Sequence, residues 1–266
     1  TVDGSFPLGG AVCATLIASG TDPFSATIIA TFAGAAAGLV TGWLNVKLKI
    51  MDLLASILMM IALYSVNLRI MGKPNVPLIT EPTVFTILQP GWISDYVARP
   101  LILIVIVILA KLALDWFFAT QTGLAVRATG SNGRMARAQG VNTGRMILGG
   151  MALSNALVAL AGALFAQTQG GSDISMGIGT IVIGLAAVIV GESILPSRRL
   201  LLVTLAVILG AIVYRFFIAL ALNSDFIGLQ AQDLNLVTAV LVVLALVLPR
   251  LRKKRVKPAS SNGKEA

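Results

Sequence analysis

The apolar residues of this chain fall into blocks of about twenty, the length that a helix needs to cross the hydrocarbon core of a bilayer. A transmembrane β-barrel would instead show short segments that alternate between polar and apolar residues. Hydrophobic residues make up 57% of the chain and charged residues only 12%, so a soluble domain is excluded. The sequence therefore predicts an all-α, polytopic transmembrane helical bundle.

We predict eight membrane segments, at residues 6–20, 24–44, 50–71, 100–119, 146–166, 176–195, 200–222 and 234–249. The first segment is short. Ser5 and Pro7 predict its start, because a capping hydroxyl followed by a proline in the first turn favours a helix N-terminus. Residues 1–249 are thus expected to form the membrane domain. The chain opens without methionine, so we expect upstream residues to be missing.

The connections between these segments alternate in charge. Basic residues gather at positions 47–49, 120–145, 198–199 and in the tail 250–266, whereas the intervening connections carry Asp22, Asp173, Asp225 and Asp233. Basic loops of membrane proteins face the cytoplasm, which predicts a cytoplasmic C-terminus. The net charge of +9 then follows from topology and needs no nucleic acid. Residues 72–99 form the longest external loop, expected to be an ordered but irregular cap over the external mouth or a plain connector.

Two residue types limit the possible chemistry. The chain has no histidine, which excludes histidine zinc sites, Ser-His triads and histidine proton relays. Its single cysteine, Cys13, can form no internal disulfide. No catalytic residue and no metal site are expected.

Charged side chains inside the predicted spans are few. Lys111 and Asp115 are four residues apart on one helix, so they can pair and lower the cost of burying either charge. We interpret them as a structural pair rather than as a relay for ions.

Small and polar residues mark faces of three other spans. Gly34, Gly38 and Gly42 recur every four residues and predict close helix packing. In the sixth span, the glycines near Thr180 either pack or line a passage. Ser154 and Asn155, in the fifth span, are candidates to face an interior path for a solute.

An arginine-rich stretch, "RATGSNGRMARAQGVNTGRM", interrupts the apolar pattern at 127–146. Ser131 or Asn132 can cap a helix of about two turns, and Gly140 can end it. Met135, Ala136 and Ala138 would then be available for contact, with Arg134 and Arg137 facing water or an acidic partner. The alternative is a helix that rests on lipid headgroups. The chain has no phosphate-binding loop, so any ATP-derived power must arrive through a docking element.

This stretch resembles the cytoplasmic coupling loop of ABC-importer permeases of the branched-chain amino acid and ribose group, where R-A-x-G-x-N-x-x-x-A-x-x-x-G-[IV] recurs. The matching residues are Arg127, Ala128, Gly130, Asn132, Ala136, Gly140 and Val141. The blocks "TVDGSFPLGGA", "LKIMDLLASILMMIALYSVNLRIMGKPN", "ALSNALVALAGALFAQTQGGSDISMGIGTIVIGLAAVIVGE" and "DLNLVTAVLVVLALVLPR" resemble a narrower subgroup. That subgroup contains incompletely characterised bacterial importers, some associated with aromatic amino acids.

The resemblance implies a permease in the bacterial inner membrane that imports a small solute, with an amino acid preferred. Its implied partners are a second permease copy, identical or different, a cytoplasmic ABC ATPase dimer, an external solute-binding protein and membrane lipids. The chain itself would need no cofactor, because ATP and Mg bind the partner ATPase. The implied coupling residues are Arg127, Gly130, Asn132, Arg134, Met135, Ala136, Arg137 and Gly140.

The "TVDGSF" block resembles the family's D-L-S-V-G-S segment, which begins a helix close to the transport path. Asp3 and Ser5 are therefore candidates for the substrate path by resemblance. Family members usually carry another hydrophobic helix before this block, in which case Asp3 would lie deeper than a cytoplasmic loop.

Two other functions fit a polytopic helical membrane protein less well. An ion-coupled secondary transporter would need coupling-ion sites, and the scarcity of embedded carboxylates counts against it. A membrane-embedded enzyme would need a nucleophile with its base, or a metal cluster, and the sequence suggests neither.

Overall fold

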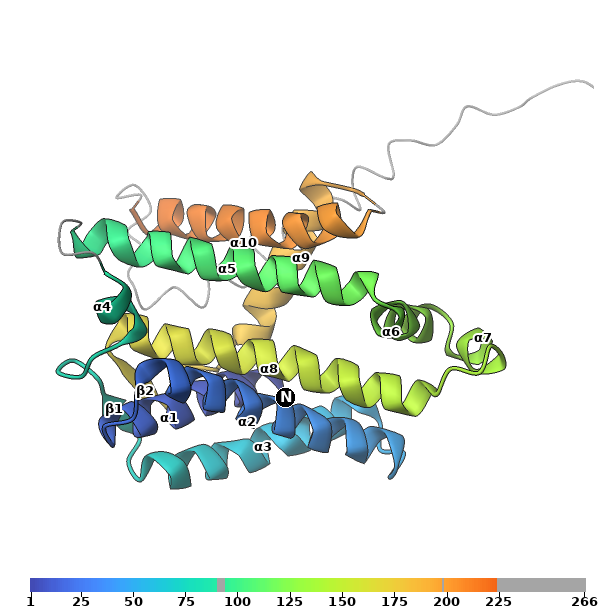
Figure 1. The fold of residues 1–266 in the computed structure, drawn as a ribbon, viewed down its shortest axis with the longest axis horizontal. Coiled ribbons are helices and arrows are strands. Elements are labelled where there is room, and N and C mark those ends of the chain that lie inside the picture. Colours follow the sequence, from blue (N-terminus) through green and yellow to red (C-terminus); the bar gives the residue numbers. More distant parts are fainter. Residues whose placement is uncertain (90–93, 198, 224–266) are drawn as a thin grey trace, which may run out of the picture. The chain divides into compact units, whose positions relative to one another are not determined.

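The computed structural model describes residues 1–89, 94–197 and 199–223, and it is almost entirely helical there (Figure 1). The chain divides into two compact units, the first ending at Thr180 and the second beginning at Ile181. The helices are α1 (Val2–Ala18), α2 (Pro23–Val46), α3 (Asp52–Met71), α4 (Val84–Leu88), α5 (Asp95–Ala119), α6 (Gln121–Ser131), α7 (Gly133–Ala138), α8 (Thr143–Gln169), α9 (Thr180–Ile194) and α10 (Leu200–Asn223). Two short strands, β1 (Asn75–Pro77) and β2 (Gly171–Asp173), complete them.

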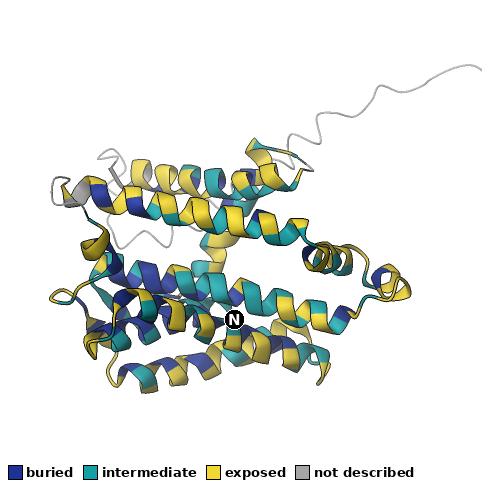
Figure 2. Ribbon diagram, viewed as in Figure 1, coloured by how far each residue is buried: buried dark blue, intermediate teal, exposed yellow. Residues whose placement is uncertain are grey.

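Among the described residues, five helices are long and apolar enough to cross a membrane: α2, α3, most of α5, α8 and most of α10. Helices α1 and α9 are apolar but shorter. Large hydrophobic side chains remain exposed over α3 and α5 (Figure 2). That exposure is expected of helices that face lipid or another membrane subunit. The predicted polytopic helical fold is confirmed.

The core of the first unit is a bundle in which α8 packs against α1 and α2, while α3 packs against α1. The row of glycines on α2 brings this helix into close contact with α8. A Cβ at Gly34 or Gly38 would overlap the backbone of α8 at Asn155 or Met151. The predicted packing face is therefore confirmed, and it is occupied by a helix of the same chain.

Helix α1 lies equally close to α8. A Cβ at Gly9 would overlap the carbonyl of Ala159, and one at Gly162 would overlap the carbonyl of Phe6. The predicted start of this helix at Ser5 and Pro7 is wrong, because α1 already includes Val2 and both residues lie inside it. Ser5 is fully buried and its hydroxyl bonds another helix, so it cannot act as a cap.

The loop 72–99 is more regular than expected. Its strand β1 pairs antiparallel with β2, with Val76 opposite Ser172. Helix α4 starts at a capping box formed by Thr83 and Thr86, and the backbone N–H of Val84 donates to Gln167 on α8. Two connections predicted to be external thus meet on one side of the bundle, as the topology requires.

Lys111 and Asp115 form the expected ion pair on α5. In the second unit, α9 and α10 pack through Gly191 and Gly210, where a Cβ would overlap the partner helix. The sixth span starts later than predicted. Gly177 and Gly179 precede α9, which begins at Thr180. The predicted span 234–249 and the tail 250–266 lie outside the described residues.

Candidate functional site

The arginine-rich stretch folds into two short helices joined at Asn132. This residue ends α6 and caps α7, since its side-chain oxygen accepts a hydrogen bond from the backbone N–H of Met135 at 3.1 Å. Gly140 follows α7 with a φ of +82°, a left-handed conformation that favours glycine. The predicted helix, its cap and its glycine end are confirmed.

The segment before Asn132 is helical, which the sequence analysis missed. Helix α6 is capped by Thr120, whose hydroxyl accepts from the N–H of Gly123. A Cβ at Gly123 would overlap the carbonyl of Phe117, so α6 turns sharply off the end of α5. Arg127 and Gly130 therefore lie on α6, and the candidate coupling residues are divided between two helices.

One side chain of α7 faces inward. Ala136 is 4% exposed, whereas Met135 is 63% exposed and Arg134 and Arg137 are exposed beside it. The prediction that Ala136 is available for contact with a partner is wrong, because its methyl group is buried within the chain. The outward face of α7 instead combines one large apolar side chain with two cations.

A pocket of about 690 Å³ lies between the arginine-rich stretch and the connection from α2 to α3. Lys49 and Asn45 border it on one side, and Arg137 and residues 140–144 on the other. Two basic connections that are distant in the sequence thus meet, as expected of loops on the same side of a membrane.

Two of the predicted path residues form a direct contact inside the bundle. The Ser5 hydroxyl donates to the side-chain oxygen of Asn155 at 2.8 Å, and both residues are buried. Ser154 is exposed on a different face of α8. Thr180 is half-buried at the start of α9. The structure therefore brings together Ser5 and Asn155, but not Ser154.

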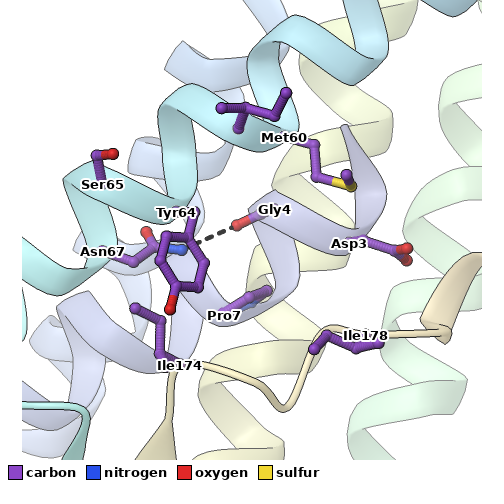
Figure 3. Close-up of a pocket in the computed structure, with 10 residues that line it drawn as sticks. Asp3, Gly4, Pro7, Met60, Tyr64, Ser65, Asn67, Ile174 and Ile178 are labelled. Carbon is purple, nitrogen blue, oxygen red and sulfur yellow. Dashed lines mark hydrogen bonds between the residues drawn. The ribbon is translucent and has the colours of Figure 1, made fainter.

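Asp3 borders a cavity of about 450 Å³ between α1, α3 and the segment that follows β2 (Figure 3). The lining residues are Asp3, Gly4, Pro7, Met60, Ile61, Tyr64, Ser65, Asn67, Ile174 and Ile178. This volume lies within the roughly 300–1,000 Å³ of typical small-molecule sites.

The cavity lies near the middle of the helices that surround it. Gly4 packs against Met60 and Leu63, which are central in α3, and Ser5 bonds Asn155, which is central in α8. Asp3 is thus at mid-depth of the bundle and not in a loop at its end.

The segment 174–179 is irregular backbone that reaches the same depth. Short turns run through it, with the N–H of Ile178 donating to the carbonyl of Ser175 and that of Thr180 to Gly177. A Cβ at Gly177 would overlap the carbonyl of Asp3, so the segment presses directly on α1. Non-helical backbone at membrane depth is tolerated where it is buried in protein or lines a cavity.

Asn67 was missed by the sequence analysis. It is 1% exposed, and its side-chain N–H donates to the carbonyl of Gly4 at 3.2 Å. A lone asparagine in the apolar run 52–71 was the signal that could have identified it.

Outside the bundle, Asp173 holds the end of β2. Its carboxylate accepts hydrogen bonds from the Ser175 hydroxyl and from the Ser175 backbone N–H, and it also accepts one from the Asn75 amide. The bonds from Ser175 hold the pKa of Asp173 below its ordinary value, with the Asn75 bond adding to them and slight burial opposing them.

Comparison with known families decides what this bundle is. Residues 2–248 match the model of the branched-chain amino acid transport system permease component. The chain belongs to this family of ABC-importer permeases.

Relatives of this permease carry names from the same class. It is 38% identical to the tyrosine transport system permease protein of Clostridioides difficile over 94% of this chain and 81% of that protein. It is 28% identical to the galactofuranose transporter permease protein of Escherichia coli, over 91% of this chain and 68% of that one. It is 26% identical to the ribose import permease protein of E. coli, over 91% of this chain and 73% of that protein. No solved structure matches the permease.

The permease is thus the multi-pass membrane component of an ABC importer. In such systems ATP is hydrolysed by a separate subunit, and a solute-binding protein is a general partner.

Proposed function

We propose that this permease imports an amino acid across the bacterial inner membrane, and that α6 and α7 receive the motion of a cytoplasmic ATPase. The relative named for tyrosine is the more similar one, at 38% identity against 26–28% for those named for sugars. The permease would work as a dimer with an identical or a second permease subunit. The partner ATPase dimer would hold ATP and Mg. The C-terminus of the permease would be cytoplasmic.

The proposed coupling role rests on the outward face of α7. Met135 offers apolar area to a partner, and Arg134 and Arg137 offer charge that orients it. The buried Ala136 packs the opposite face of α7 against the rest of the chain.

The connections of α7 give its motion a route into the membrane. After Gly140 the chain enters α8, whose first turn is capped by Asn142. Helix α8 then runs unbroken to Asn155 and its contact with Ser5 on α1. A state of the ATPase that binds one position of α7 more tightly would therefore shift the bundle between conformations.

Co-purification with the ATPase of the same transport system tests this role. Met135→Asp places a charge on the proposed contact face, and we expect it to abolish ATPase binding while the permease stays in the membrane. Ile79→Asp is the matched control, because Ile79 is also a highly exposed apolar residue but lies in the external loop. If both variants retain the ATPase, α7 is not the docking element.

Dependence on ATP separates this function from ion-coupled transport. We expect vanadate to stop uptake in energised vesicles and a protonophore to leave the initial rate unchanged when ATP is supplied. The reverse pattern would establish the secondary transporter instead.

A further inference from the structure

We propose that the pocket between the arginine-rich stretch and the connection from α2 to α3 binds the phosphate of an anionic phospholipid, such as phosphatidylglycerol. Three features of the pocket carry this proposal: its two cations, an unpaired hydroxyl in its wall, and its position at the ends of apolar helices. The proposal concerns which lipid the permease holds, so it does not depend on the transported solute.

The two cations come from segments that are far apart in the sequence. Lys49 belongs to the connection after α2, and Arg137 to the last turn of α7. Neither forms an ion pair within the part of the chain that the structure describes, and no Asp or Glu lines the pocket. Asp52 is held by the amide of Asn45 at the border and does not itself line the pocket. An anion between Lys49 and Arg137 would pair with both charges.

The start of α8 adds a hydrogen-bond donor to the same pocket. Thr143 lines it and is 8% exposed, yet its hydroxyl makes no hydrogen bond among the described residues. Unlike the fully enclosed oxygen of Asn67, this hydroxyl keeps accessible surface, so a ligand in the pocket can reach it. The first N–H groups of a helix also have no partner within the helix, and they favour phosphate. The missing partner is therefore an anion that accepts hydrogen bonds.

The surroundings of the pocket indicate that this anion belongs to a lipid. Trp43, in the last turn of α2, is exposed, and tryptophan is enriched where a helix meets the membrane surface. Leu48 and Met51 are exposed on either side of Lys49, and Ile147 is exposed in the pocket lining. These side chains offer acyl chains an apolar surface beside the cations. Basic pockets between membrane helices recognise anionic headgroups in this way.

The test uses the fluorescence of Trp43 in the full-length permease, with Trp92 and Trp116 replaced by phenylalanine. The protein is reconstituted in phosphatidylcholine vesicles that contain a fixed fraction of brominated phosphatidylglycerol or of brominated phosphatidylcholine, because bromine quenches a nearby indole. Asn45 and Val46 border the pocket and follow Trp43 within one helical turn, so a lipid held there lies within reach. We expect brominated phosphatidylglycerol to quench more strongly. Equal quenching by the two lipids would overturn the proposal.

A pair of double variants separates the pocket from general surface attraction. Lys49→Gln with Arg137→Gln removes the two cations of the pocket. Lys47→Gln with Arg145→Gln is the matched control, since it removes the same charges from the same two stretches at exposed residues that do not line the pocket. We expect the first variant to lower the preference for phosphatidylglycerol by about fivefold or more, and the control to lower it much less. Equal losses would overturn the proposed site.

Two single variants cover the case in which the double variant does not fold. Lys49 has a φ of +55°, a left-handed conformation that favours glycine, so Lys49→Gly removes the charge without straining the backbone. Thr143→Val removes only the unpaired hydroxyl. Both variants should fold and should lower the preference for phosphatidylglycerol. An unchanged preference in both would contradict the proposal.

A competition experiment identifies the source of the phosphate. Excess sodium phosphate should leave the quenching by brominated phosphatidylglycerol as it is in sodium chloride of equal ionic strength, because the acyl chains add to the binding of the lipid. If phosphate abolishes the difference between the two lipids, the pocket binds a soluble anion and the lipid proposal is wrong. If the two lipids quench equally and Lys49→Gly releases the ATPase, the pocket instead receives an acidic segment of that partner.

Discussion

Ser5 on α1 donates a hydrogen bond to the side-chain oxygen of Asn155 on α8, across 150 residues of sequence and between two buried side chains. The Asn155 amide also donates to the carbonyl of Met151 within α8, which fixes its orientation. This contact joins α1 to the middle of α8. Its loss should therefore affect both stability and transport.

Ser5→Ala removes the donor and leaves the Asn155 oxygen without this bond in the core. Interhelical hydrogen bonds in membranes contribute about 0.6 kcal/mol on average and up to about 1.7 kcal/mol. We expect a loss of stability in that range, measured by unfolding in mixed micelles. Ser154→Ala, on the exposed face of α8, should change stability by less. Equal effects would show that the buried bond contributes nothing.

Gly38→Ala should destabilise the bundle, because its Cβ would overlap the carbonyl of Met151. Overpacking of this kind costs about 1–3 kcal/mol. Gly149→Ala is the control within the opposing helix, since a Cβ there meets nothing within 4 Å. That change should be neutral or stabilising, because alanine favours a helix over glycine by roughly 1 kcal/mol. Thermal unfolding of the two variants should therefore shift in opposite directions.

Asp115→Asn should lower the yield of folded permease, because it leaves the half-buried Lys111 without its carboxylate. A lone charge within a span costs about 2.5–3.5 kcal/mol on insertion scales. The exchange Lys111→Asp with Asp115→Lys restores the pair and should recover much of the yield. If the exchange fails while Asp115→Asn folds normally, the pair has no structural role.

Asp173 should make the turn after β2 sensitive to acid. Its pKa is lowered in the folded chain, so its bonds stabilise the fold above the ordinary aspartate pKa and are lost as the pH falls through the lowered value. We expect a small effect, since the carboxylate is largely exposed to solvent. Asp173→Asn should reduce the difference in unfolding temperature between pH 6 and pH 3. An unchanged difference would assign the acid sensitivity to other groups.

Several elements were predictable because their cause is local. Block length and polarity located α2, α3 and α8, and the four-residue spacing of Gly34, Gly38 and Gly42 predicted a packing face. Asn132 and Gly140 bounded α7 because a side-chain cap and a left-handed glycine act within a few residues.

Other features depend on residues far away in the chain and could not be predicted. The pairing of β1 with β2 brings together two loops that are about a hundred residues apart. A strand of three residues is also too short to show the alternation of polar and apolar residues that predicts a strand. The burial of Ala136 and the role of Asn67 depend on which helix packs against them. Helix α6 was overlooked because its glycines and polar residues outweighed its helical propensity.

Helix α8 is continuous over 27 residues, from Thr143 near the end of the arginine-rich stretch to Gln169 beside β2. At 1.5 Å per residue it is a rod of about 40 Å, longer than the roughly 30 Å hydrocarbon core. The contact of Asn155 with Gly34 lies near the midpoint of α8. The backbones of α2 and α8 touch there, so this point can act as a pivot. A tilt of about 5° around that fulcrum would move each end by roughly 2 Å in opposite directions. Such a tilt would turn an inward push at the α7 end of α8 into an outward displacement at the end that meets β2.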